Sequence, residues 1–201
     1  MTPSLLDLDG AIAALAQGGV VALPTDTVYG VAASVDAEDG VSALFALKHR
    51  PSEMALPILV DSVDQITRLG VAWPSGAQRL ADRFWPGALT IVVRAPEYLA
   101  RRVGSPTNSV GLRIPNLDLV RDVLARSGPL AVTSANDHGQ PPCTSADEVL
   151  ETFASSSHLA GVLDGGLRDG AVSTVVDLTG PRWRVLREGA IATTEIADAL
   201  L

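Results

Sequence analysis

The stretch Val20-Val21-Ala22-Leu23-Pro24-Thr25-Asp26-Thr27-Val28-Tyr29-Gly30 joins an apolar run to a polar cluster. The run Val20–Leu23 predicts a strand, because a short uninterrupted series of β-branched and apolar residues suits a buried strand. If the chain stays extended beyond it, Thr25, Thr27 and Tyr29 share one face and offer their hydroxyl groups to a polar ligand. A capped turn, in which Thr and Asp side chains bond their own backbone, accounts for the same residues.

Strand-like runs of this kind alternate with helical patterns along the chain. Further strands are predicted at Leu56–Val60, Leu89–Val93, Val110–Ile114, Leu130–Val132, Thr174–Leu178 and Trp183–Leu186. Helices are predicted at Gly10–Gln17, Ala37–His49, Ser75–Phe84, Asp118–Arg126 and Ala146–Phe153. The alternation indicates an α/β protein with helices packed on a sheet. A short turn at Gly180-Pro181 predicts a closing hairpin, and hence a mixed rather than purely parallel sheet.

The composition suits one globular domain over residues 1–201, with 47% hydrophobic and 19% charged residues. No run reaches the ~18 apolar residues of a membrane span, and the N-terminus lacks the basic start of a signal peptide. The single cysteine, Cys143, excludes an internal disulfide and fits a cytoplasmic location. Because the net charge is −8, any nucleic-acid role is expected to be local, weak or indirect.

Lys48 and Arg50 are the first candidates for anion binding. Pro51 disfavours helical backbone at Arg50, so the two cations can project together from a helix end. Two neighbouring cations suit a phosphate chain, but basic residues that complement a helix dipole give the same pattern.

The segment Ser109–Ile114 alternates between apolar and other residues. Ser109, Gly111 and Arg113 take one face, where Gly111 would leave room for a ligand and Arg113 would suit a carboxylate or phosphate. An ordinary half-exposed strand is the alternative.

Polar residues also follow the predicted strand Leu130–Val132. Ser134 and Asn136 come where Leu130–Val132 should end, and either hold an amino acid or nucleotide or simply form a turn. Ligands of open α/β sheets lie at the carboxyl ends of strands. Ser134–Asn136, Arg113 near the end of Val110–Ile114, and Arg187 after the last run are therefore expected to converge with Pro24–Gly30, which follows Val20–Leu23.

Arg187 closes the last predicted strand. Alternation places it on the face of Trp183 and Val185, directed towards the protein, and leaves Arg184 to solvent. A charge in that position needs a partner or an anionic ligand. Glu188 is the alternative partner, and a bulge near Gly189 would change the facing.

Several common signatures are absent from the sequence. It has neither a G-x-x-x-x-G-K-[ST] loop nor a G-x-G-x-x-G fingerprint, and no Cys/His spacing typical of zinc sites. The Trp85-Pro86-Gly87 turn is interpreted as packing and Cys143 as a bystander. Asp26 is a suspected general base on its position in the sequence alone.

Together the clusters resemble the YrdC/TsaC family of threonylcarbamoyl-AMP synthases in its short, single-domain form. The motifs that carry the resemblance are PTDTVYG at 24–30, K-x-R at 48–50, FWPGALT at 84–90, SVGLRIP at 109–115, TSAN at 133–136, DGG at 164–166, STVVD at 173–177 and LREGAI at 186–191. Each motif alone is weak, but their order is specific to the family.

The resemblance implies an open, twisted, YrdC-like α/β fold and a role as a cytoplasmic nucleotidyltransferase. Such an enzyme makes threonylcarbamoyl-AMP and pyrophosphate from L-threonine, bicarbonate and ATP, with Mg²⁺ held mainly through the ATP phosphates rather than by a protein metal site. Transfer to tRNA would involve separate partner proteins, and no membrane is implied. The residues implied for threonine are Thr27, Arg113, Ser134 and Ser173. Those implied for ATP are Lys48, Arg50, Ser109, Asn136, Thr144 and Arg187, with Lys48 and Arg50 as the catalytic cations.

One position departs from the family pattern, because Met54 stands where many relatives carry a third basic residue.

Two other functions are compatible with the scaffold. One is an enzyme with another substrate, such as a YciO-like paralogue or a carbamoyl-adenylate domain of hydrogenase maturation proteins. The other is an RNA-binding module, against which the acidic balance argues.

Overall fold

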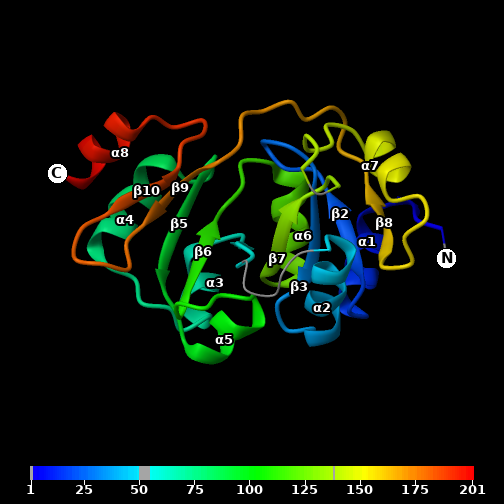
Figure 1. Ribbon diagram of the computed structural model, residues 1–201, viewed down its shortest axis with the longest axis horizontal. Coiled ribbons are helices and arrows are strands. Elements are labelled where there is room, and N and C mark those ends of the chain that lie inside the picture. The colour runs from blue at the N-terminus through cyan, green and yellow to red at the C-terminus, as the bar shows by residue number, and fades with distance from the viewer. Residues whose placement is uncertain (1, 50–54, 138) are drawn as a thin grey trace.

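A computed structural model describes residues 2–49, 55–137 and 139–201, and its strands form one open sheet (Figure 1). The strand order across this ten-stranded sheet is β1-β8-β2-β3-β7-β4-β6-β5-β9-β10. The strands are β1 Ser4–Leu6, β2 Val20–Leu23, β3 Gly30–Ser34, β4 Ile58–Leu59, β5 Leu89–Arg94, β6 Ser109–Arg113, β7 Leu130–Ser134, β8 Leu159–Leu163, β9 Thr174–Asp177 and β10 Arg184–Arg187.

Helices alternate with the strands as predicted, but those at Val63–Arg68, Glu97–Arg102 and Thr193–Leu200 were not predicted from the sequence. The helices are α1 Leu8–Ala16, α2 Glu38–Leu47, α3 Val63–Arg68, α4 Ser75–Phe84, α5 Glu97–Arg102, α6 Asp118–Ser127, α7 Ala146–Thr152 and α8 Thr193–Leu200. None of the helices in the described residues is long and apolar enough to cross a membrane. Ser145 caps α7 by accepting from Glu148 N at 3.2 Å.

The sheet is mixed, as the predicted hairpin requires. β9 and β10 pair antiparallel, and so do β2 with β3 and β3 with β7. β5 pairs parallel with β9, and β2 parallel with β8. The predicted open, mixed α/β sheet is therefore confirmed.

The chain forms two wings (Figure 1). One wing contains β5, β6, β9 and β10 with α4 and α8, and the other contains β2, β3, β7 and β8 with α1, α2, α6 and α7. The short strand β4 joins them, because it pairs with β6 on one side and β7 on the other. The segment that leads from β8 to β9 runs across the top of the valley between the wings.

The apolar side chains form two clusters. Successive residues of β3 belong to different clusters, with Val31 in one and Ala32 in the other, as the two faces of a strand require. The larger cluster includes residues of α2, α4 and α7, and the smaller one packs β2, β3 and β7 against α1 and α6. Helices thus pack against the sheet in both wings.

Candidate functional site

A cavity of about 310 Å³ opens in the valley, and both wings and β4 line it. Thr25, Thr27, Tyr29, Val132 and Ser134 line it from one wing, and Thr90, Arg113, Ser173 and Arg187 from the other. Leu59 of β4 and Pro57, which precedes β4, supply an apolar floor. Of the residues implied for substrates, Thr27, Arg113, Ser134, Ser173 and Arg187 therefore meet in one place.

The strand-end argument explains only part of this convergence. β2 and β7 end beside the same residue, because both Leu23 and Ser134 pair with Gly30. The polar residues that follow the two strands are therefore neighbours, as predicted. The strand-end rule does not account for Arg113. Leu59 of β4 pairs with Arg113 on one side and Leu130 on the other, so the end of β6 lies level with the start of β7, not with its end.

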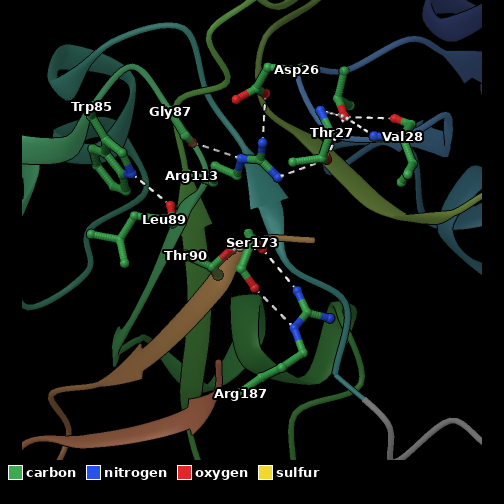
Figure 2. Close-up of polar contacts among 11 residues, drawn as sticks. Asp26, Thr27, Val28, Trp85, Gly87, Leu89, Thr90, Arg113, Ser173 and Arg187 are labelled. Atoms are coloured by element: carbon green, nitrogen blue, oxygen red, sulfur yellow. Dashed lines mark hydrogen bonds and ion pairs between the residues drawn. The ribbon is translucent and has the colours of Figure 1, made fainter. Parts of the chain in front are cut away.

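The loop that follows β2 reaches Arg113 directly (Figure 2). Asp26 accepts from Arg113 Nη2 at 2.6 Å, and Thr27 Oγ1 accepts from Nη1 at 3.4 Å. Arg113 Nε donates to the Gly87 carbonyl at 2.9 Å. Arg113 is only 6% exposed. Burial lowers the pKa of Arg113, and the Asp26 carboxylate opposes that shift.

Thr25 and Tyr29 have structural roles beside the cavity. Thr25 Oγ1 bonds the carbonyl of Val28 and accepts from the backbone amides of Thr27 and Val28, which is the capped turn of the alternative interpretation. The Tyr29 hydroxyl donates to the Gly166 carbonyl at 2.9 Å and accepts from Gly165 N at 3.0 Å. The extended face of three hydroxyl groups is therefore wrong, and only Thr27 of the three retains a contact with Arg113.

Arg187 occupies the opposite wall. Its Nε donates to the Ser173 carbonyl at 3.0 Å and its Nη2 to Ser173 Oγ at 2.9 Å, while Ser173 Oγ lies 3.0 Å from Thr90 Oγ1. Partial burial lowers the pKa of Arg187, although the residue as a whole is exposed. Two contacts agree with the predicted facing: Trp183 and Val185 pack against the core, and Arg187 bonds Ser173 in the cavity wall.

Two details of the last strand differ from expectation. A register shift lies between Val185 and Arg187 rather than at Gly189. Arg184 is not left to solvent alone, since it forms an ion pair with Asp177 at 2.6 Å. Glu188 accepts from the Thr193 hydroxyl, and no ion pair joins it to Arg187 within the part of the chain described.

Lys48 and Asn136 lie next to the cavity. Lys48 is 8% exposed, and its Nζ donates to the carbonyl oxygen of Asn136 and, at 2.7 Å, to Asn136 Oδ1. Ser134 Oγ, which lines the cavity, donates to the same Oδ1 at 2.7 Å. Lys48 does lie at a helix end, but the prediction that its side chain projects from there is wrong, because Asn136 holds it against the protein.

The remaining predicted residues lie farther out. Ser109 starts β6 and lies 2.9 Å from Thr107 Oγ1, at the opposite end of the strand from Arg113. Thr144 lies in a separate hollow, where Glu148 accepts from its amide at 2.7 Å. Arg50 and Met54 are outside the described residues.

Three contributions were not found from the sequence. Thr90 joins Ser173 in the cavity wall, and the Trp85-Pro86-Gly87 turn supplies the carbonyl that holds Arg113 in addition to packing. Asp26 is paired with Arg113, a contact that no local pattern in the sequence signals.

The prediction of ligand space beside Gly111 is wrong, because a Cβ there would lie 3.0 Å from Thr90 Cγ2.

An open mixed sheet whose cleft brings two guanidinium groups to a set of hydroxyl groups defines an α/β protein with a cavity suited to a small zwitterionic or anionic molecule. Residues 13–189 match the family model for Sua5, YciO and YrdC, described as "Telomere recombination". The chain belongs to this family.

Curated relatives are threonylcarbamoyl-AMP synthases. The chain is 39% identical over 191 residues to a putative enzyme of this name from Mycobacterium tuberculosis, covering 94% of this chain and 87% of the relative. It is 37% identical to the enzyme from Serratia proteamaculans, covering 86% of this chain and 93% of that one.

Solved structures agree with the fold. Sua5 of Pyrococcus abyssi complexed with L-threonine superposes with a TM-score of 0.89 and 33% identity, covering 99% of this chain and 60% of that chain. Escherichia coli YciO has a TM-score of 0.83 at 19% identity, which shows the shared fold alone.

Proposed function

We propose that this protein is a threonylcarbamoyl-AMP synthase, a nucleotidyltransferase that converts L-threonine, bicarbonate and ATP to threonylcarbamoyl-AMP and pyrophosphate. The observation that carries the proposal is the pair of unlike guanidinium groups in one cavity. Arg113 is neutralised by Asp26 and suits the carboxylate of a zwitterion, whereas Arg187 brings positive charge for phosphate. The similarity to curated synthases supports this assignment.

The threonine subsite is assigned to Thr27, Arg113, Ser134 and Ser173. Arg113 is held at three points, by Gly87, Thr27 and Asp26, so its remaining N–H groups are pre-oriented for a carboxylate. The apolar floor of Pro57 and Leu59 offers contact to the methyl group of the substrate.

The ATP subsite is assigned to Lys48, Arg50, Ser109, Asn136, Thr144 and Arg187. Lys48 and Arg187 approach the cavity from opposite wings, so a phosphate chain between them would be neutralised on two sides. Ser109 and Thr144 lie beyond the cavity, and their assignment requires ATP to extend along the valley.

The proposed reaction requires mainly that the residues position the two substrates and neutralise the phosphate charge. Bicarbonate supplies carbon dioxide by losing hydroxide, and the neutral threonine amine adds to the carbon dioxide and loses a proton, which with the hydroxide makes water. A carbamate oxygen then attacks the α-phosphorus while pyrophosphate leaves in line. Holding the amino acid at Arg113 and the phosphates at Lys48 and Arg187 would convert this encounter into a step between fixed reactants. No nucleophilic side chain is required.

Mg²⁺ fits this proposal as an ion carried by ATP. The described residues contain no group of three or more His, Cys, Asp or Glu side chains able to hold a metal ion. The protein would then leave Mg²⁺ to the phosphates and water, as is common for this ion. When bound, the ion would neutralise the phosphate charge, while the residues of the chain orient both substrates.

The wider setting is also part of the proposal. Residues 1–201 would act as one YrdC-like domain in the cytoplasm and pass the intermediate to partner proteins that modify tRNA. With a net charge of −8, the chain is expected to bind tRNA only weakly and in a salt-dependent way. Neither a YciO-like function nor a carbamoyl-adenylate domain gains specific support, since the neighbours of those kinds share the fold at 15–19% identity.

Release of pyrophosphate tests the proposed function. We expect release only when ATP, L-threonine and bicarbonate are all present. Omission of threonine and replacement of threonine by L-valine are the matched controls. ATP turnover that is equal without threonine would contradict the proposal, and so would no turnover under any condition.

A further inference from the structure

The segment 164–173, which we call the strap, leads from β8 to β9 across the top of the valley (Figure 1). Gly170 N donates to the carbonyl of Thr27 at 2.8 Å. A Cβ on Gly170 would lie 2.6 Å from the carbonyl oxygen of Asp26, so the two backbones approach too closely for a side chain to fit. The strap therefore lies directly on the loop that follows β2 and lines the cavity.

The strap connects two residues that the proposed function assigns to ATP. Arg168 N donates to the Thr144 carbonyl at 2.7 Å. At the other end of the strap, the hydroxyl oxygen of Ser173 accepts from Arg187 Nη2 at 2.9 Å. An ATP molecule that extends along the valley from Arg187 to Thr144 therefore spans the same two points as the strap, in which Arg168 is the only cation.

The positive charge of Arg168 is not neutralised in the described part of the chain. Its Nη2 donates to the Gly165 carbonyl, within the strap itself, and its Nε is buried without an acceptor among the described residues. Asp164 accepts from the Tyr29 hydroxyl and from Gly166 N, and no ion pair between described residues includes Arg168. A partly buried guanidinium in this state is unfavourable until an anion binds to it.

Two neighbouring groups show where this charge acts. Burial raises the pKa of Tyr29, which lines the cavity, and the charge of Arg168 opposes that shift. Burial also raises the pKa of Cys143, and there the charge of Lys48 is among the opposing influences. Because the Cys143 carbonyl accepts from Tyr29 N at 3.0 Å, Lys48 and Arg168 act on two residues in contact. Arg168 thus adds positive charge on the side of the cavity where Lys48 lies.

We propose that Arg168 binds a phosphate group of ATP, as a third cation beside Lys48 and Arg187. This rests on the proposed function and adds a residue that lies outside the motifs that carry the family resemblance. A guanidinium forms two parallel hydrogen bonds with a phosphate, which would give acceptors to N–H groups of Arg168 that now have none. The Thr144 carbonyl fixes the backbone of Arg168, so the side chain reaches the phosphate from a defined point.

The binding of ATP and of L-threonine, each measured by titration calorimetry, tests the assignment. Arg168→Gln removes the charge and keeps part of the side chain, so the Kd for ATP should rise at least about tenfold. The Kd for L-threonine should stay the same. Arg168→Lys keeps the charge and should lose less affinity for ATP. Arg182→Gln, at an exposed arginine outside the strap, is the matched control and should change neither Kd.

The L-threonine measurement separates phosphate binding from a purely structural role of Arg168. Since Gly170 of the strap bonds Thr27, a strap displaced by loss of the bond between Arg168 and Gly165 would weaken threonine binding as well. Equal losses for both ligands in Arg168→Gln would therefore overturn the inference. A wild-type Kd for ATP in this variant would overturn the inference alone, whereas a wild-type protein that binds no ATP contradicts the proposed function itself.

Chemical labelling of the wild-type protein is a second test, which needs no variant. Phenylglyoxal modifies arginine side chains, and peptide mass spectrometry measures the labelling rate at Arg168. Saturating ATP should slow the labelling of Arg168 but not that of Arg182, and adenosine at the same concentration should slow neither. Absence of protection by ATP, or equal protection by adenosine, would overturn the phosphate assignment even if Arg168→Gln fails to fold.

Discussion

Arg113 and Arg187 reach the same cavity, but only Arg113 is paired with a carboxylate in the described part of the chain. Asp26 lies 2.6 Å from Arg113 Nη2, while Arg187 bonds the carbonyl and hydroxyl of Ser173. The two guanidinium groups are close enough that the charge of Arg187 helps to lower the pKa of Arg113. The cavity therefore has a neutralised side and a positive side, and the predictions below follow from that difference.

Arg187→Ala should weaken ATP-dependent activity far more than it weakens folding. Loss of a charged hydrogen-bond donor at the phosphates corresponds to about 1.5–3 kcal/mol, or roughly ten- to hundredfold in kcat/KM for ATP. Steady-state kinetics and melting curves measure both effects. Arg182→Ala is the control, because Arg182 is exposed, whereas Arg184 also supports Asp177. Equal activity in the two variants would refute the role of Arg187.

Asp26→Ala should destabilise the fold, because it leaves Arg113 buried without its counter-charge. Breaking such a pair from one side costs about 3 kcal/mol, which urea unfolding can measure. The double variant Asp26→Ala with Arg113→Met removes both charges and should recover much of the stability without recovering threonine binding. A single variant as stable as the wild type would show that the ion pair does not hold Arg113.

Lys48 is the only lysine in the sequence, so amine-directed chemistry reports on one side chain. ATP should protect Lys48 from acylation, with the N-terminal amine as the internal control in mass spectrometry. Lys48→Met should lower ATP-dependent activity and also Tm by roughly 4–8 °C, since loss of its bonds to Asn136 costs about 2 kcal/mol. An unchanged Tm would indicate that Lys48 is not held as described.

Much of this arrangement follows from sequence pattern. Val20–Leu23 and Ser75–Phe84 have the predicted bounds, because an unbroken β-branched run and a strong amphipathic pattern leave little choice. β3 was missed since Gly30–Ser34 consists of small residues, and Gly30 is needed there because a Cβ would lie 2.8 Å from Val132 Cγ1. A strand of small residues such as β3 is recognised from its pairing with neighbouring strands rather than from its own sequence pattern.

The site shows the same division. Thr27 and Ser134 were placed together by the rule that ligands lie at strand ends, which holds for β2 and β7. The Asp26–Arg113 pair depends on the distance between the two wings, which β4 joins. No local pattern in the sequence encodes that distance. The burial of Lys48 was likewise missed. It depends on Asn136, which follows β7, rather than on the helix that ends at Leu47.

Cys143 should be unreactive near neutral pH. Burial raises the pKa of this thiol, and its side chain is 6% exposed, so the thiolate is disfavoured in the folded state. Because the folded pKa lies above the unfolded one, the contribution of Cys143 to stability is present at neutral pH and declines as pH rises past the unfolded pKa. Iodoacetamide labelling should be slow in buffer and fast in urea. Equally fast labelling in both would contradict the burial of Cys143.

Tyr29→Phe should lower stability by about 1–3 kcal/mol, since it deprives Gly165 N and the Gly166 carbonyl of their shared partner. Burial raises the pKa of Tyr29, so the phenol is neutral and able to donate. Urea unfolding measures the loss, and Tyr98→Phe on the exposed face of α5 is the control. Two variants of equal stability would show that the hydroxyl of Tyr29 does not anchor residues 164–166.

The identity of the adenylated product tests the central claim most directly. The purified protein is incubated with ATP, L-threonine and carbon-13 bicarbonate, and the nucleotide product is identified by mass spectrometry. The account predicts threonylcarbamoyl-AMP that contains the heavy carbon, with pyrophosphate released in equal amount. An adenylate of threonine without the heavy carbon would contradict it, because the carboxylate rather than a carbamate would then have attacked the phosphate.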